Sequence, residues 1–191
     1  MLELIQNWIM LKNYIIEFNP NIDLNIEIQA VAVIRDKKTG WPLLPVVMTN
    51  ENITRVLPEL ECGLTMDKTI GKFYVSITKR FYDEYALAKP LFFECSMMHE
   101  LGHYLHKDLQ NGYGNEINQK RHLNDILNNR VTKEEFEADI FALSETSKSM
   151  VINDLNYLAQ YLRKRPSLPE EALIAQKEIQ IRIKAIQKYK G

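Results

Sequence analysis

Cysteine is scarce in this chain, and its scarcity excludes several small-protein architectures. The 191 residues include only two cysteines, Cys62 and Cys95, which do not form a CxxC pair. A disulfide scaffold and a cysteine zinc knuckle are therefore not indicated, and a reducing compartment is favoured. We expect Cys95 to be a core residue, because free cysteine is among the most buried residue types.

Long apolar runs, repeats and low-complexity segments are also missing. No stretch reaches the roughly 20 apolar residues that a membrane-spanning helix needs. The first residues carry neither a basic leader nor a small-residue cleavage site, so we expect a cytoplasmic protein with no membrane partner. The hydrophobic fraction of 46% and the charged fraction of 26% are typical of a globular protein, which argues against disorder.

The chain has little net charge, but the charge is unevenly distributed. The formal net charge is −1, which gives no overall attraction to nucleic acid. Residues 161–191 contain eight Lys and Arg against three Asp and Glu, whereas residues 1–160 contain sixteen against twenty-two. The basic residues are dispersed along a segment with helical periodicity, so we expect a packed amphipathic helix and consider nucleic-acid binding unlikely. The apolar residues expected to pack are Leu173, Ile174, Ile179, Ile181, Ile183 and Ile186.

The order of the predicted elements indicates an α+β fold. Apolar residues between Leu4 and Ile15 recur at roughly helical spacing, which predicts an N-terminal amphipathic helix that ends near residues 19–21. Three later segments have strand patterns, and a turn cluster at 36–40 follows the first of them, so we expect a small antiparallel sheet. Those strands are 25–34, 45–48 and 71–78, and the helices expected after them are 90–107, 119–129, 132–148, 150–164 and 169–189.

The first of these later helices carries the motif His99-Glu100-Leu101-Gly102-His103. Residues four apart lie on the same face of a helix, so the imidazoles of His99 and His103 can share one metal ion. Glu100 stands beside that pair, where its carboxylate can take a proton from a zinc-bound water. This HExxH pattern predicts two zinc ligands and a general base, and Gly102 suggests a packing or access requirement within the helix.

A catalytic zinc site normally has three protein ligands, so a third must come from elsewhere. The segment EFEADIFA at 135–142 is the candidate, because helical spacing places Glu135, Ala138, Asp139 and Ala142 on one face. The small alanines would allow a close approach to the motif helix. We therefore predict Glu135 as the third ligand, with Asp139 accepting the free ring N–H of a ligating histidine.

The two segments HELGHYLH and EFEADIFA together resemble the ImmA/IrrE-type metallopeptidases over roughly residues 70–145. The resemblance implies zinc binding by His99, His103 and Glu135, with Glu100 as the catalytic base and Asp139 at the Asn/Asp position of the second motif. It implies a zincin-like metallopeptidase domain, which we place at 1–150, with 151–191 as a helical extension packed on it. No role is carried over to His106. Tyr113 and His122 could each stabilise an oxyanion, but no motif places either.

The expected function is zinc-dependent cleavage of a protein substrate. Members of the resembled family act on DNA-binding repressors, which implies a helix-turn-helix repressor as a candidate substrate. Two alternatives remain open at this stage. One is a regulatory binding module that keeps the fold without proteolysis, against which the intact Glu100 argues. The other is a zinc hydrolase with a non-peptide substrate, which the same ligands permit.

Overall fold

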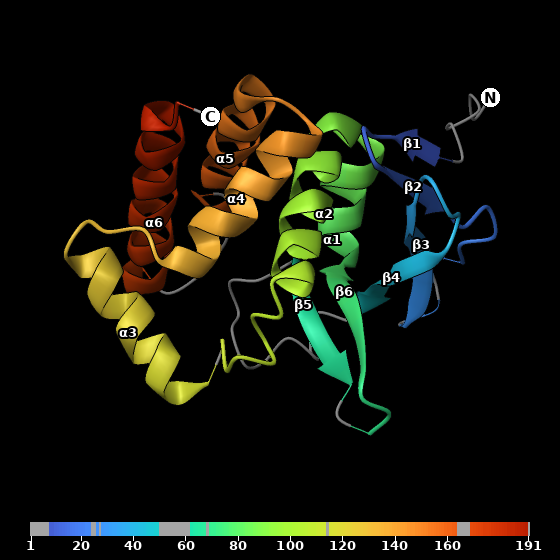
Figure 1. Ribbon diagram of the computed structural model, residues 1–191, viewed down its shortest axis with the longest axis horizontal. Coiled ribbons are helices and arrows are strands. Elements are labelled where there is room, and N and C mark those ends of the chain that lie inside the picture. The colour runs from blue at the N-terminus through green and yellow to red at the C-terminus, as the bar shows by residue number, and fades with distance from the viewer. Residues whose placement is uncertain are drawn as a thin grey trace. The chain divides into compact units, whose positions relative to one another are not determined.

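The fold combines a six-stranded sheet with helices (Figure 1), and it is described here from a computed structural model. The structure describes residues 8–23, 26, 28–49, 62–67, 69–113, 115–163 and 169–190. The chain divides into two compact units, residues 1–94 and 95–191. The predicted boundary near residue 150 falls inside a helix of the second unit, so these units differ from the predicted ranges 1–150 and 151–191.

The first unit is built on a mixed sheet with strand order β1-β2-β3-β4-β6-β5. Neighbouring strands are antiparallel except for the parallel pair β4 and β6. The prediction of a purely antiparallel sheet is therefore wrong at this pair. Enough chain separates the two strands for a crossover connection, which parallel pairing requires. The strands are β1 (Trp8–Met10), β2 (Tyr14–Phe18), β3 (Gln29–Asp36), β4 (Pro42–Thr49), β5 (Cys62–Asp67) and β6 (Lys72–Thr78).

The predicted N-terminal helix is wrong over the described residues. Residues 8–18 instead form the hairpin β1–β2, and residues 1–7 lie outside the described part of the chain. The side chains of Ile16 and Phe18 are buried while Glu17 between them is exposed, which is the alternation of a strand. Pairing of β2 with β3 over five residues stabilises this conformation, and β-branched isoleucines favour it over a helix.

The turn cluster at 36–40 forms the hairpin that its residues predict. Asp36 Oδ1 accepts a hydrogen bond from the backbone N–H of Thr39 at 2.7 Å, and Gly40 has a φ of 72°. Strand β3 begins at residue 29 and ends at 36 where 25–34 was predicted, and β4 extends past both ends of the predicted 45–48. Strand β5 was not predicted, and it pairs with β6 along the side opposite to β4.

The core of the first unit lies between the sheet and the aromatic residues that follow β6. Ile16, Ile34 and Leu44 on the strands are fully buried. The ring of Phe81 stacks on that of Tyr85 with centroids 4.1 Å apart, in the segments α1 (Lys79–Phe81) and η1 (Tyr82–Leu87). Burial of these large apolar side chains stabilises the unit.

The helices of the second unit begin and end within a few residues of their predicted bounds. They are the later part of α2 (Pro90–Leu105), α3 (Glu116–Leu127), α4 (Lys133–Glu145), α5 (Lys148–Arg163) and α6 (Pro169–Lys188). Local sequence explains several of these starts, because proline is favoured in the first turn of a helix, as in α2 and α6, and asparagine is favoured at the N-cap, as in α3. The side chain of Asn115 caps α3 by accepting the backbone N–H of Asn118 at 2.8 Å. No helix in the described ranges is long and apolar enough to cross a membrane.

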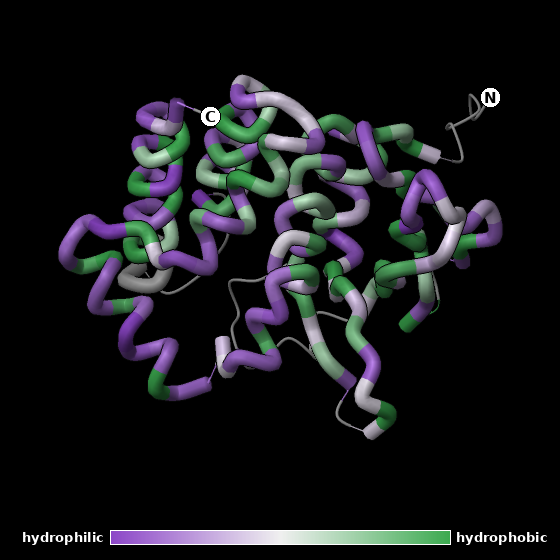
Figure 2. Tube along the Cα trace, viewed as in Figure 1, coloured by the Kyte–Doolittle hydropathy of each residue, from purple (hydrophilic) through white to green (hydrophobic). Residues whose placement is uncertain are grey.

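Helix α6 packs on α5 and α4, as its apolar stripe predicts. Hydrophobic and hydrophilic residues alternate around α5 and α6 in Figure 2, as expected for helices that bury one side. Lys148 Nζ at the start of α5 donates to the carbonyl oxygens of Gln187 and Tyr189 at the end of α6, at 2.9 and 2.7 Å. Of the predicted packing residues, Ile179, Ile181, Ile183 and Ile186 are buried, whereas Leu173 is 65% exposed.

This packing predicts a large difference between two truncations on the same helix. Ile186→Ala should lower the free energy of unfolding by about 2–5 kcal/mol, because Ile186 is completely buried. Leu173→Ala, the matched control, should change it by less than about 0.5 kcal/mol, because that side chain is exposed. Urea unfolding followed by circular dichroism measures both values. Equal effects of the two substitutions would contradict the packing of α6.

Candidate metal centre

The centre lies where α2 and α4 approach each other closely. Gly102 of α2 makes this approach possible, because a Cβ at its position would lie 3.0 Å from Ala138 Cα and 3.2 Å from Phe141 Cβ. Ala138 is fully buried, so α4 also presents a small side chain at this contact. The motif glycine is therefore a packing residue, and the helix–helix contact brings the acidic face of α4 to the two histidines.

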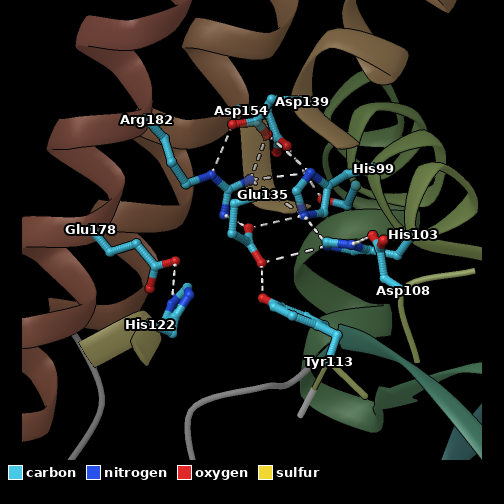
Figure 3. A network of polar contacts seen from close by, with 11 residues as sticks. His99, His103, Asp108, Tyr113, His122, Glu135, Asp139, Asp154, Glu178 and Arg182 are labelled. Carbon is cyan, nitrogen blue, oxygen red and sulfur yellow. Dashed lines mark hydrogen bonds and ion pairs between the residues drawn. The ribbon is translucent and has the colours of Figure 1, made fainter. Parts of the chain in front are cut away.

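His99, His103 and Glu135 form a compact group of potential ligands (Figure 3), in which one atom of each lies within 4.8 Å of the other two. The two Nε2 atoms of the histidines face each other at 3.1 Å. Glu135 Oε2 lies 3.3 Å from His99 Nε2, and Oε1 lies 3.5 Å from His103 Nε2. The structure thus brings together the three ligands that the sequence predicts, and the group is compatible with a metal ion.

The other nitrogen of each imidazole is held by a buried carboxylate. His99 Nδ1 lies 2.9 Å from Asp139 Oδ1, and His103 Nδ1 lies 2.8 Å from Asp108 Oδ2. In the neutral imidazole, a carboxylate at Nδ1 favours the tautomer with the proton on Nδ1, which makes Nε2 the nitrogen available to a metal. Arg182 Nη2 also lies 3.2 Å from His99 Nδ1. Asp139 occupies the position predicted for it. Asp108 was not predicted, because it lies in the turn after α2, beyond the helical spacing that relates the motif residues.

Electrostatic interactions keep the acidic ligand ionised. Burial on its own raises the pKa of Glu135, but the Arg182 guanidinium and the two histidines outweigh it and hold the pKa well below the usual range. Burial disfavours the charged form of His103 as well and so lowers its pKa. Hydrogen bonds to Asp108 and Glu135 outweigh burial and raise the pKa of His103 to about 10. Metal binding at these histidines must therefore release protons.

Arg182 of α6 reaches the same group, although the sequence places it in the dispersed basic tail. Its Nη1 lies 3.0 Å from Glu135 Oε2, and its Nε and Nη2 form a two-point contact with the carboxylate of Asp139 at 2.9 and 2.6 Å. The Arg182 side chain is only 11% exposed. A signal was available in the sequence, because Ile179, Arg182, Ile183 and Ile186 have the i, i+3, i+4, i+7 spacing of a buried helix face.

Tyr113 and His122, which no motif places, also lie at the centre (Figure 3). The Tyr113 hydroxyl donates to Glu135 Oε1, and its ring stacks on His103 with centroids 5.2 Å apart. Burial and the charge of Glu135 raise the pKa of Tyr113, so the phenol remains protonated. His122 Nε2 lies 2.9 Å from Glu178 Oε1 of α6, and its ring meets Tyr113 edge-on.

The remaining predicted residues lie outside the ligand group. Glu100 is half-buried beside His99 on α2, and its charge contributes to the raised pKa of His103. His106 is exposed, in agreement with the absence of a predicted role. Cys95 is buried, as predicted for a core cysteine, and its thiol lies 3.7 Å from Thr146 Oγ1.

Comparisons of this chain with protein-family profiles, curated protein sequences and solved structures found no match. The function must therefore be inferred from the motifs and from the arrangement of the side chains.

The geometry distinguishes two glutamates that are only two residues apart. Glu135→Ala should lower zinc affinity by about 100-fold or more, because it removes a ligand, a larger change than the loss of an outer partner. Glu137→Ala should leave it unchanged, because Glu137 pairs with Lys133 at 3.7 Å on another face of α4. Metal content after gel filtration and competition with a chromophoric chelator measure both. Zinc loss in Glu137→Ala with retention in Glu135→Ala would show that the ligand assignment is wrong.

The buried carboxyl group of Asp154 on α5 should make the stability of the protein depend on pH. Ser96 Oγ donates to its Oδ2 at 3.3 Å, its Oδ1 is buried with no partner in the described part of the chain, and burial raises its pKa to about 7. Between about pH 4 and 7 the native state keeps a proton that the unfolded state has lost, so stability falls as the pH rises through this window, by at most about 1.4 kcal/mol per pH unit.

Asp154→Asn removes this titration and should therefore be more stable than the wild type at pH 8, with a smaller advantage at pH 5. Urea unfolding of both proteins at the two pH values, in the presence of a chelator, measures the difference. An advantage that does not change between pH 5 and pH 8 would contradict the raised pKa.

Proposed function

We propose that this protein is a zinc-dependent metallopeptidase in which His99, His103 and Glu135 hold the metal. The observation that carries the proposal is that both Nε2 atoms face a common position beside Glu135, while both Nδ1 atoms are held by carboxylates. Two imidazoles and one carboxylate on an HExxH helix are a donor set typical of catalytic zinc, with a fourth position left for water or substrate. We also propose that the fold is zincin-like.

The chain's own residues then have distinct roles. A bound zinc ion would supply Lewis acidity, polarising a water molecule and the substrate carbonyl. Glu100 accepts a proton from that water as the water oxygen forms a bond to the substrate carbonyl carbon. It then delivers the proton to the amine nitrogen as the C–N bond breaks. Asp108 and Asp139 orient the imidazoles, and Tyr113 fixes one oxygen of Glu135 by a hydrogen bond. No described group other than Glu100 is placed by the motif to carry the proton.

The proposed substrate is a protein, and the resemblance of the two motifs to ImmA/IrrE-type peptidases makes a DNA-binding repressor the first candidate. The group contains three potential ligands among the described residues, and Glu100 follows His99 directly, which supports a catalytic over a purely structural zinc site. A structural ion has four protein ligands and needs no adjacent base. A hydrolase acting on a non-peptide substrate would use the same residues, so the substrate must be identified by experiment.

Glu100→Gln should separate metal binding from catalysis. The variant should keep its zinc and its melting temperature, because Glu100 lies outside the ligand group. Its peptidase rate should fall by about 10²–10⁴-fold, because the general base is lost. Cleavage of a proteome-derived peptide library, read by mass spectrometry, measures the rate over many candidate sequences at once.

The Glu137→Ala variant is the matched control for this experiment, since it also removes one carboxylate but leaves the centre intact. It should cleave the library like the wild type. Zinc-loaded wild-type protein that cleaves neither the library nor a helix-turn-helix repressor would refute the peptidase proposal and favour a binding module. Activity of Glu100→Gln equal to wild type would refute the role of Glu100.

A further inference from the structure

Arg182 is the only arginine or lysine that contacts the ligand group within the described residues, and neither motif of the centre contains it. It comes from α6, 43 residues beyond Asp139 and 83 beyond His99. Its guanidinium contacts two predicted metal ligands, Glu135 at 3.0 Å and His99, whose Nδ1 lies 3.2 Å from Nη2. It also contacts the carboxylate of Asp139, which orients His99. These contacts connect the last described helix to the centre.

The guanidinium of Arg182 bridges two carboxylates. Nε and Nη2 face the two oxygens of Asp139, and Nη1 reaches Oε2 of Glu135. The guanidinium is planar, so its five donors have fixed directions, and it can hold both carboxylates at a set separation. A lysine ammonium has the same charge but cannot reproduce this two-sided contact.

The position of Arg182 on α6 also supports a specific role for this residue at the centre. Glu178 lies one turn before Arg182 and pairs with His122 of α3, so the same side of α6 contacts both α3 and α4. Lys177 provides a contrast, since its Nζ donates to the carbonyl oxygen of Leu127 at 2.9 Å and does not enter the ligand group. Two neighbouring cations of one helix thus serve different contacts.

We propose that Arg182 is a positioning residue of the metal centre, which sets the orientation of Glu135 and that of His99, the latter both directly and through Asp139. This inference rests on the proposed metal site but not on peptidase activity. The charge of Arg182 by itself would weaken metal binding, because a cation beside the site repels a metal ion. Positioning predicts weaker metal binding when Arg182 is replaced, whereas repulsion predicts tighter binding.

The test compares Arg182→Met, Arg182→Lys and the matched control Lys177→Met with the wild type. Zinc dissociation constants are measured by chelator competition, and the visible absorption bands of the cobalt(II)-substituted proteins report the ligand geometry. Arg182→Met should bind zinc about 10–100-fold more weakly, as is typical for the loss of outer partners of metal ligands, with altered cobalt bands. Arg182→Lys should also be weaker, by roughly tenfold. Lys177→Met should match the wild type in both measurements.

Arg182→Lys decides the question if Arg182→Met fails to fold, because it keeps the buried charge that Asp139 and Glu135 require. Wild-type affinity and cobalt bands in Arg182→Lys would overturn the proposal, as would tighter zinc binding in Arg182→Met. A wild-type protein that binds zinc but cleaves no peptide would refute the peptidase function and leave this inference intact. A wild-type protein that binds neither zinc nor cobalt would refute both.

Discussion

The close contact between α2 and α4 is the constraint on which the centre depends. A Cβ at position 102 would approach Ala138 Cα to 3.0 Å, so a residue larger than glycine would require α2 and α4 to move apart by a few tenths of an ångström. A wider helix separation would move Glu135 away from both imidazoles, because the three side chains are anchored on these two helices. Glycine within a helix costs about 1 kcal/mol relative to alanine, and at position 102 it permits this close approach of the two helices.

The same contact brings several carboxylates together in a buried place, and histidines and an arginine neutralise their charge. Glu135, Asp108 and Asp139 are all buried, and burial of unpaired carboxylates would be strongly unfavourable. Each is paired with a histidine, and Arg182 adds a cation between two of them. This pairing keeps Glu135 and Asp139 ionised and also holds the side chains in fixed orientations. Metal ligands are typically oriented by such hydrogen-bond partners.

Residues within one motif could be predicted from the sequence by helical periodicity, and the two motifs could be joined because a catalytic zinc site needs a third ligand. Residues outside both motifs could not be predicted. The i, i+4 spacing of His99 and His103 and the shared face of Glu135 and Asp139 follow from the geometry of one helix each. Asp108 and Arg182 reach the centre through a turn and through a distant helix, and no local pattern links either of them to the two motifs.

The errors in the predicted fold have the same origin. The apolar residues before Phe18 fit a helix as well as a strand, and pairing with β3 decides between them. The parallel pairing of β4 with β6 depends on where the chain returns after residue 49, which periodicity does not encode. Strand β5 contains Gly63, a residue that is disfavoured in strands, and this hides it from a pattern search.

The distance along the chain between His99 and Arg182 has a consequence for biosynthesis. Both histidines, Glu135 and Asp139 leave the ribosome before residue 182 does, since 83 residues separate His99 from Arg182 and 43 separate Asp139 from it. At a synthesis rate of about 5–20 residues per second, this interval lasts several seconds. A nascent chain therefore carries the HExxH helix without the guanidinium that contacts it, and the full network forms only when α6 has been made and has docked.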